Sequence, residues 1–540
     1  MDQFGLKLVF LLVVFISVSA QNELLVQTKL GKIKGSILRT VNDNEIKSFR
    51  GIRYAQAPVG DKRFKAPIKV SPWGEKVFDA SKDGFQCPQP FIAKELISED
   101  CLHLSVYTKN LHGNLPVIVY IHGGANYLGS SNSESNVGPD YLLDHDIVLV
   151  SLNYRLGALG FLSTKTAEAP GNYGFLDQVM ALQWVEDHIS SFGGNPRLVT
   201  IAGHSSGGTA VTLHMVSPLS KGLFHRAITM SGSYTNHYHL NSLMWTRKIA
   251  SELACPLYNP KDVINCLRNV TWERLIQVRG TLELYGFSDQ EWNYEVDGHV
   301  LLDTPTNLFA KGDFHKVPIM AGITKDELNY FFSKQENNTG LLNDISLNFD
   351  KYAPQLFIFD PNDRVHEKSR RIQQFYLGNK KIQNQDFINF SKIFSDAIIN
   401  NGVHRLVELA RKYVDVFYYR FDYLGRYSLF SNEEGKPRGV GHADDLQYIL
   451  GTKWFEKKIE LHDPEMFMVE RITKWWTSFA QNGIPCKNSG INWLASNKTN
   501  IYTIYNNKDV SLGGKPFSDR NRFWDELIPI KESAIQKQPY

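Results

Sequence analysis

Residues 198–208 read Leu-Val-Thr-Ile-Ala-Gly-His-Ser-Ser-Gly-Gly. The apolar run over 198–202 enters a G-x-S-x-G turn centred on Ser205, and helix-compatible residues continue over 209–216. A tight turn between a strand and a helix forces neighbouring backbones together, so only residues without Cβ fit beside the serine. The stretch therefore predicts strand, turn and helix, with Ser205 exposed at the turn. Ordinary Gly/Ser turns also match G-x-S-x-G, so the surrounding chain must decide.

The composition is that of a large folded protein. The 540 residues are 42% apolar and 21% charged, and no repeat, low-complexity tract or Pro/Ser-rich linker divides them. We expect one large domain over 21–540 that carries insertions. The net charge of +3 is small and no long Lys/Arg run is present, which argues against nucleic acid as a partner.

Residues 1–20 have the pattern of a secretory signal peptide. Lys7 precedes an apolar run over 8–18, and Val18-Ser19-Ala20 is a small-residue cleavage pattern. This run is too short to span a membrane, and no other stretch reaches about 18 consecutive apolar residues. We expect cleavage after Ala20, secretion to the extracellular space and no stable membrane anchor.

Secretion changes how the five cysteines are interpreted, because disulfides persist in oxidising compartments. Cys87 lies close to Cys101 in sequence and Cys255 lies close to Cys266, so we expect two local disulfides with Cys486 left over. Buried free thiols are the alternative, because spacing does not fix connectivity. Sequons for N-glycosylation, which favour surface loops, occur at Asn269, Asn337, Asn389 and Asn497.

Apolar runs that are hydrophobic on both faces recur along the chain, which indicates a central, mostly parallel sheet covered by helices. Helical spacing over 177–189, a Gly-Gly-Asn-Pro break at 193–196 and the strand before Ser205 follow one another as in an α/β crossover. Segments 233–313 and 328–411 have a mainly helical pattern and are expected to be insertions over one face. The other expected elements are a hairpin over 24–38, strands over 102–107, 117–121, 147–152, 227–230, 317–321 and 416–421, and a helix over 466–481.

A serine hydroxyl is a weak nucleophile, so it needs a histidine to take its proton and an acid to orient that histidine. In α/β-hydrolases these groups follow in the order Ser, Asp or Glu, His. Asp326 and Glu327 come just after the expected strand 317–321, and His442 lies in a glycine-rich loop. The pattern alone does not separate Asp326 from Glu327, and any one of the 16 histidines is more often structural.

Acyl transfer also needs backbone N–H groups that point at the developing oxyanion. Ser206 offers one, and the loop His122-Gly123-Gly124-Ala125, after the strand 117–121, offers others. A simple strand-ending turn is the alternative interpretation of this loop. Asp444 and Asp445 lack partners at any metal-ligand spacing and are interpreted as charges at a helix N-terminus.

With these motifs in place, the chain resembles the type-B carboxylesterase/lipase family, which includes carboxylesterases, cholinesterases and insect esterases. The resemblance implies an α/β-hydrolase fold, with a mostly parallel sheet flanked by helices and large helical insertions. It implies a serine carboxylic-ester hydrolase that acts on small-molecule esters through an acyl-enzyme, without a metal or other cofactor. The matching stretches are collinear and cover 49–67, 98–102, 115–125, 153–163, 171–208, 223–233, 322–327 and 439–446.

The resemblance also assigns residues. It implies a catalytic triad of Ser205, Glu327 and His442, which selects Glu327 over Asp326. The implied oxyanion donors are the N–H groups of Gly124, Ala125 and Ser206. The implied disulfides join Cys87 to Cys101 and Cys255 to Cys266.

Three positions depart from the family pattern. Ala125 stands where glycine is usual, and Ser206 stands where alanine is usual. Both act through the backbone N–H, so the donors are retained, while the freedom of the loop and the room around the acyl carbon are in question. His204 stands where cholinesterases and many carboxylesterases have glutamate. We expect it to tune local electrostatics without replacing His442 as the base.

Only 13 residues separate Cys87 from Cys101, and none is tryptophan. Cholinesterases have a longer loop here, with a tryptophan that binds a quaternary ammonium by cation–π contact, and fungal lipases have a long lid. The sequence therefore resembles a general insect-type esterase for small to medium hydrophobic esters, whether xenobiotic, odorant, dietary or hormonal. The alternatives are an enzyme like the juvenile hormone esterases, which have Gln and Ala around the nucleophile, and a non-catalytic adhesion protein like the neuroligins, which an intact triad disfavours.

Overall fold

A computed structural model describes residues 24–133, 137–235, 242–278, 294–329, 338–357, 359–360, 362–378, 386–432, 434–452, 455, 457–485, 493–496, 502–505 and 510–530. The expected signal peptide, the sequons at Asn337 and Asn497, and Cys486 lie outside these residues. Within the described part of the chain, no helix is long and apolar enough to cross a bilayer.

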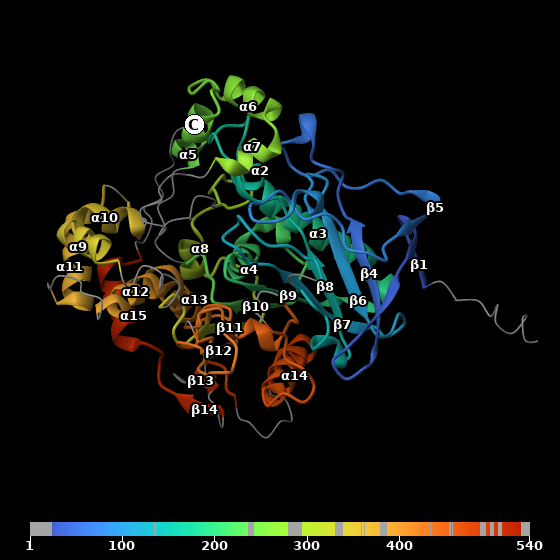
Figure 1. Cartoon of the computed structure of the whole chain (residues 1–540). Helices are drawn as coiled ribbons and strands as arrows, with labels where there is room; N and C mark the ends of the chain where they lie inside the picture. The colour runs from blue at the N-terminus through green and yellow to red at the C-terminus, as the bar shows by residue number, and fades with distance from the viewer. Residues whose placement is uncertain are drawn as a thin grey trace, which may run out of the picture.

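The fold is built on a large twisted sheet that crosses the whole molecule (Figure 1). Among the described residues its strand order is β14-β13-β12-β11-β10-β9-β7-β8-β6-β4-β3. Pairing is parallel from β8 through β13 and antiparallel at both edges, as expected for a mostly parallel sheet with antiparallel additions. The strands are β3 (Ser36–Arg39), β4 (Glu45–Arg53), β6 (His103–Thr108), β7 (Leu115–Ile121), β8 (Val148–Leu152), β9 (Gly194–His204), β10 (Arg226–Met230), β11 (Ile319–Thr324), β12 (Val416–Phe421), β13 (Tyr502–Tyr505) and β14 (Val510–Gly513).

The N-terminal hairpin is confirmed as β1 (Leu25–Thr28) paired antiparallel with β2 (Gly31–Lys34). A second, small sheet forms where β2 also pairs with β5 (Gly74–Asp79).

Helices cover both faces of the large sheet, and the alternation along β7 shows how each face is filled. Val117, Val119 and Ile121 join the apolar core under α3 and α4, whereas Ile118 and Tyr120 join the core under α14. Each strand residue is thus buried on one side or the other, which explains the continuous apolar runs. The helices are α2 (Gly157–Phe161), α3 (Tyr173–His188), α4 (Ser206–Val216), α5 (Ser242–Glu252), α6 (Pro260–Asn269), α7 (Trp272–Gln277), α8 (Pro305–Lys311), α9 (Thr339–Leu347), α10 (Phe349–Leu356), α11 (Val365–Leu377), α12 (Phe387–Phe394), α13 (Asn401–Ala410), α14 (Met466–Asn482) and α15 (Ser518–Leu527).

The two segments expected to be helical insertions are helical. In Figure 1, α5, α6 and α7 gather at the top of the molecule, and α9 to α12 form a group at its left edge with α15. The late helix is confirmed as α14, and its Trp475 and Trp476 are core residues with exposures of 3% and 2%.

One expected boundary is partly wrong. The chain does break at Gly193, which ends the preceding helical turn with φ 79°, but the break does not extend to Pro196, because β9 already begins at Gly194. Leu115 of β7 pairs with Gly194, and the register then shifts before Val117 pairs with Val199. This register shift in the β7–β9 pairing accommodates Gly194 and Pro196 within the strand, where a loop was expected.

The sulfur atoms of Cys87 and Cys101 are bonded, as are those of Cys255 and Cys266. Asn269, at the end of α6, and Asn389, in α12, are both exposed, so both sequon side chains are accessible to solvent.

Candidate active site

Ser205 occupies the turn between β9 and α4, in a conformation that serine rarely adopts (φ 57°, ψ −124°). Its own N–H donates to the carbonyl of Met230 at 2.9 Å, which ties the turn to β10. A Cβ added to Gly203 would lie 2.4 Å from the carbonyl carbon of Gly207, and one added to Gly207 would lie 2.1 Å from the Ile121 oxygen. The glycines are therefore needed because backbone passes directly over backbone here.

Glu327 lies just beyond the end of β11, and its carboxylate is fully buried. Its Oε1 accepts the backbone N–H of Thr324 at 2.8 Å, and its Oε2 is 2.8 Å from Nδ1 of His442. Both carboxylate oxygens are thus occupied by groups that fix the orientation of the acid. The imidazole of His442, 14% exposed, is held by one ring nitrogen and keeps Nε2 for other partners.

Asp326, which the sequence pattern alone does not separate from Glu327, makes different contacts. Its carboxylate accepts the backbone N–H of Val440 at 3.0 Å and the amide of Asn329 at 3.2 Å. Its backbone N–H donates to the Val440 carbonyl at 2.8 Å. Asp326 therefore joins the loop of Glu327 to the loop of His442, and it does not contact the imidazole through any of these bonds.

The loop after β7 passes directly beside the serine. A Cβ on Gly123 would meet the His204 carbonyl oxygen at 2.6 Å and the Ser205 Cβ at 3.1 Å. Gly124 has φ 114°, and Ala125 continues the left-handed course with φ 55°. The structure thus brings the three residues expected to supply oxyanion donors, Gly124, Ala125 and Ser206, to the same end of the sheet as Ser205.

Comparison with known proteins agrees with this geometry. The model of the Carboxylesterase family matches residues 22–524. The chain belongs to the carboxylesterase family. Its fold is therefore the α/β-hydrolase fold, and its activity is the hydrolysis of carboxylic esters.

Named relatives of this carboxylesterase cover most of its length. Esterase FE4 of Myzus persicae is 35% identical over 90% of this chain and 89% of its own. Juvenile hormone esterase of Tribolium castaneum is 32% identical over 88% of this chain and 86% of its own. A carboxylic ester hydrolase of Bombus ignitus is 31% identical over 98% of both chains.

His204 of this carboxylesterase, the residue before the serine, packs against the imidazole of His442. The two ring centroids are 4.5 Å apart, with a tilt of 42° between the planes. His204 is buried, and neither of its ring nitrogens has a hydrogen-bond partner in the described part of the chain. Burial first, and the neighbouring His442 second, hold the pKa of His204 well below its ordinary value. His204 is therefore a neutral ring against the histidine of the site.

Asp445 lies at the N-terminus of a short helical turn, as expected from the sequence, but neither Asp444 nor Asp445 is an ordinary charged side chain at a helix end. Both are buried, with exposures of 3% and 1%, and neither side chain caps the short turn of Leu446–Tyr448 that follows. Asp444 accepts hydrogen bonds from Ser428 and from the Gly441 N–H. Burial raises the pKa of each carboxyl from 3.8 to about 7. The expected position at a helix start is therefore correct, whereas the expected charge is not, because tertiary packing buries both carboxyls.

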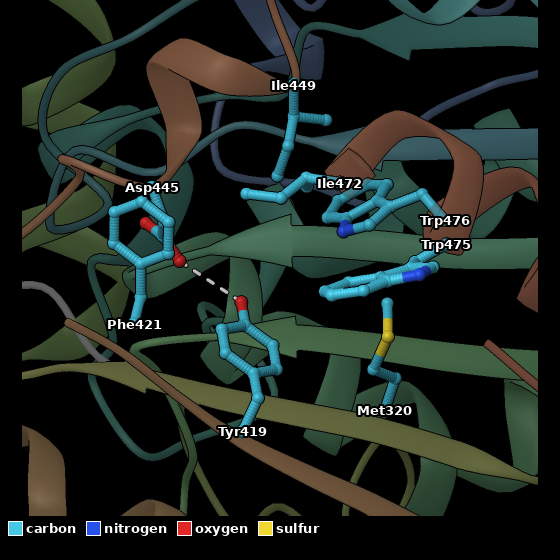
Figure 2. A pocket seen from close by; sticks show the side chains of 8 residues that line it. All are labelled: Met320, Tyr419, Phe421, Asp445, Ile449, Ile472, Trp475 and Trp476. Carbon is cyan, nitrogen blue, oxygen red and sulfur yellow. Dashed lines mark hydrogen bonds between the residues drawn. The ribbon is translucent and has the colours of Figure 1, made fainter. Parts of the chain in front are cut away.

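Asp445 lies at the side of a small cavity between α14 and strands β11 and β12. Figure 2 shows its hydrogen bond from the Tyr419 hydroxyl, 3.1 Å long, on one side of the cavity and the indoles of Trp475 and Trp476 on the other. After burial, the charge of Glu327 is the second cause that raises the pKa of Asp445. This carboxyl therefore couples electrostatically to the acid of the site.

Ser205, Glu327 and His442 are the triad expected from the sequence, and Glu327 and His442 are in direct contact in the structure. The contacts of Asp326 and Asp445 beside them were not expected from the sequence. In the sequence, the sign of these contacts would have been a polar residue next to an expected site residue. Polar residues in exposed loops show the same sequence pattern, so it does not distinguish the two cases. Among the described residues, no cluster of three or more His, Cys, Asp or Glu side chains is arranged to hold a metal ion.

Proposed function

We propose that this carboxylesterase acts through an acyl-enzyme, with Ser205 as nucleophile, His442 as general base and acid, and Glu327 as the group that orients the imidazole. The observation that supports this most strongly is the 2.8 Å contact between His442 Nδ1 and the buried Oε2 of Glu327. Because Glu327 engages Nδ1, the other ring nitrogen is left to exchange the proton of Ser205. The strained turn at Ser205 presents the hydroxyl for that exchange.

The reaction then has two halves. Ser205 Oγ attacks the ester carbonyl carbon while His442 accepts its proton, and the carbonyl π electrons move to the oxygen. That oxyanion is bound by the N–H groups of Gly124, Ala125 and Ser206. The C–O bond to the alcohol breaks as His442 returns the proton to the leaving oxygen. Water, deprotonated by His442, attacks the acyl carbon, and the acid leaves as Ser205 regains its proton.

The proposed substrates are small to medium hydrophobic carboxylic esters, and the proposed location is extracellular. The loop of 13 residues between Cys87 and Cys101 leaves little room for a lid or for an aromatic group that would bind a cationic alcohol. Juvenile hormone specificity is not proposed, because the relative with that name is no more similar than the relative named esterase FE4. A non-catalytic adhesion role is not proposed, because Ser205, Glu327 and His442 are all present and the relatives that match most of this chain are named as esterases or ester hydrolases.

Hydrolysis of p-nitrophenyl acetate and butyrate by the purified protein tests this proposal. The Ser205→Ala variant should lose at least about 10³-fold in kcat, because the nucleophile is gone while binding groups remain. Circular dichroism should show an unchanged fold. A variant that still releases a burst of p-nitrophenol would contradict the role of Ser205.

A further inference from the structure

The Ser206 side chain makes a contact that the usual alanine at this position could not make. Its Oγ accepts the backbone N–H of Asn126 at 3.3 Å, across 80 positions of sequence. Ser206 begins α4, directly after the serine of the site, and Asn126 directly follows Ala125. The hydroxyl therefore joins the start of the helix to the far end of the loop that carries two of the oxyanion donors.

The near end of the same loop is held by Tyr154, a fully buried residue just after β8. The Tyr154 hydroxyl donates to the carbonyl of His122 at 2.9 Å, and the two rings stack with centroids 4.4 Å apart.

Ser206 therefore holds the far end of the loop, at Asn126, and Tyr154 holds the near end, at His122. Asn126 is fixed at its other groups as well: its carbonyl accepts the N–H of Gly157 at 2.8 Å, and its side-chain oxygen accepts the Tyr294 hydroxyl at 3.1 Å. The loop 122–126 is therefore held at both ends, and Ser206 anchors its far end to the turn that carries Ser205.

The loop needs such support because of its backbone. Ala125 and Asn126 have φ values of 55° and 58°, in the left-handed region that alanine in particular disfavours. Two successive residues in this region persist only where surrounding contacts hold them. Relaxation of Ala125 toward an ordinary conformation would turn its N–H away from the oxyanion.

We propose that the Ser206 hydroxyl is a positioning group that holds the loop 122–126 in the geometry that binds the oxyanion. Ser206 thus has two roles in the reaction. Its N–H donates to the oxyanion, and its hydroxyl supports the loop that carries the N–H donors of Gly124 and Ala125. We call this supporting contact the brace. This inference rests on the proposed function, since it assumes that these N–H groups bind the oxyanion.

The test compares Ser206→Ala and Ser206→Thr with the parent enzyme, using p-nitrophenyl butyrate. Loss of one supporting hydrogen bond should lower kcat of Ser206→Ala by about 10-fold, while KM changes by less than about 2-fold, because the oxyanion exists only in the transition state. Ki for a trifluoromethyl ketone, which adds to the serine as a tetrahedral adduct, should rise by a similar factor. Ser206→Thr keeps the hydroxyl and should stay within about 3-fold of the parent.

Ser478→Ala is the matched control. It removes a helical serine hydroxyl whose bond, to the Ile484 carbonyl at 2.8 Å, lies on the far end of α14. The brace is overturned if Ser206→Ala keeps the parent kcat and Ki, or if Ser206→Ala and Ser206→Thr lose activity equally. A parent protein without turnover of any ester would instead refute the proposed function, so the two failures are distinct.

Discussion

Glu327 and His442 are joined twice, once through their side chains and once through their backbones. The imidazole Nδ1 lies 2.8 Å from the carboxylate Oε2, and the His442 N–H donates to the Glu327 carbonyl at 2.8 Å. The two loops come from positions 115 residues apart, and a backbone bridge between Glu327 and Gly441 adds to their connection. The orientation of the imidazole is therefore determined by the backbone as well as by the carboxylate.

Glu327→Gln should reduce kcat by about 10⁴-fold, because an amide cannot hold the correct imidazole tautomer or stabilise the imidazolium. Asp326→Asn provides the matched control, because it also replaces a carboxylate with an amide, one residue earlier. It weakens the bond to the Val440 N–H but leaves the contact of Glu327 with His442, so we expect a loss of about 10-fold or less. Steady-state kinetics on a p-nitrophenyl ester measure both. The opposite ranking would show that Asp326 is the acid of the site.

A charge placed at residue 204 should move the pH dependence of the reaction. Because the pKa of His204 is held well below its ordinary value, His204 stays neutral in mild acid and should add no acid limb of its own to the dependence of kcat/KM on pH. In His204→Glu a carboxylate would face the ring of His442, stabilise the imidazolium and shift the acid limb upward by about one pH unit. The readout is kcat/KM against pH. His204→Gln is the neutral control, and equal acid limbs in the two variants would rule out an electrostatic role for this position.

Asp445→Asn should stabilise the fold increasingly as the pH rises. The pKa of Asp445 is raised from 3.8 to about 7, so between these values the unfolded chain gives up a proton that the folded protein keeps. Stability of the parent therefore falls as the pH rises through this window, and the neutral amide removes that contribution. We expect the Tm difference, variant minus parent, to be several degrees more positive at about pH 8 than at about pH 5. A difference that stays constant with pH would show that Asp445 does not titrate there.

The order of the fold and the turn at Ser205 could be predicted from the sequence because they depend on local rules. Gly203 and Gly207 mark the turn because steric contact permits nothing larger, and apolar runs mark buried parallel strands. The start of β9 could not be read, because its pairing with Leu115 depends on a register shift in another strand.

The brace and the buried acids could not be predicted for a related reason. Ser206 and Asn126 are far apart in sequence, and an exposed serine at the start of a helix would look identical in a sequence. Asp445 has the local pattern of a capping residue, yet α14 and the strands around Tyr419 bury it. Such properties exist only after distant elements have packed together.

Active-site labelling with a fluorophosphonate, read by intact mass and peptide mapping, tests the role of Ser205 most directly. We expect stoichiometric addition to the parent protein on the peptide that contains Ser205, and no addition to the folded Ser205→Ala variant, because only an activated serine attacks phosphorus. Folded parent protein that remains unlabelled, or that is labelled at another residue, would show that Ser205 is not the nucleophile.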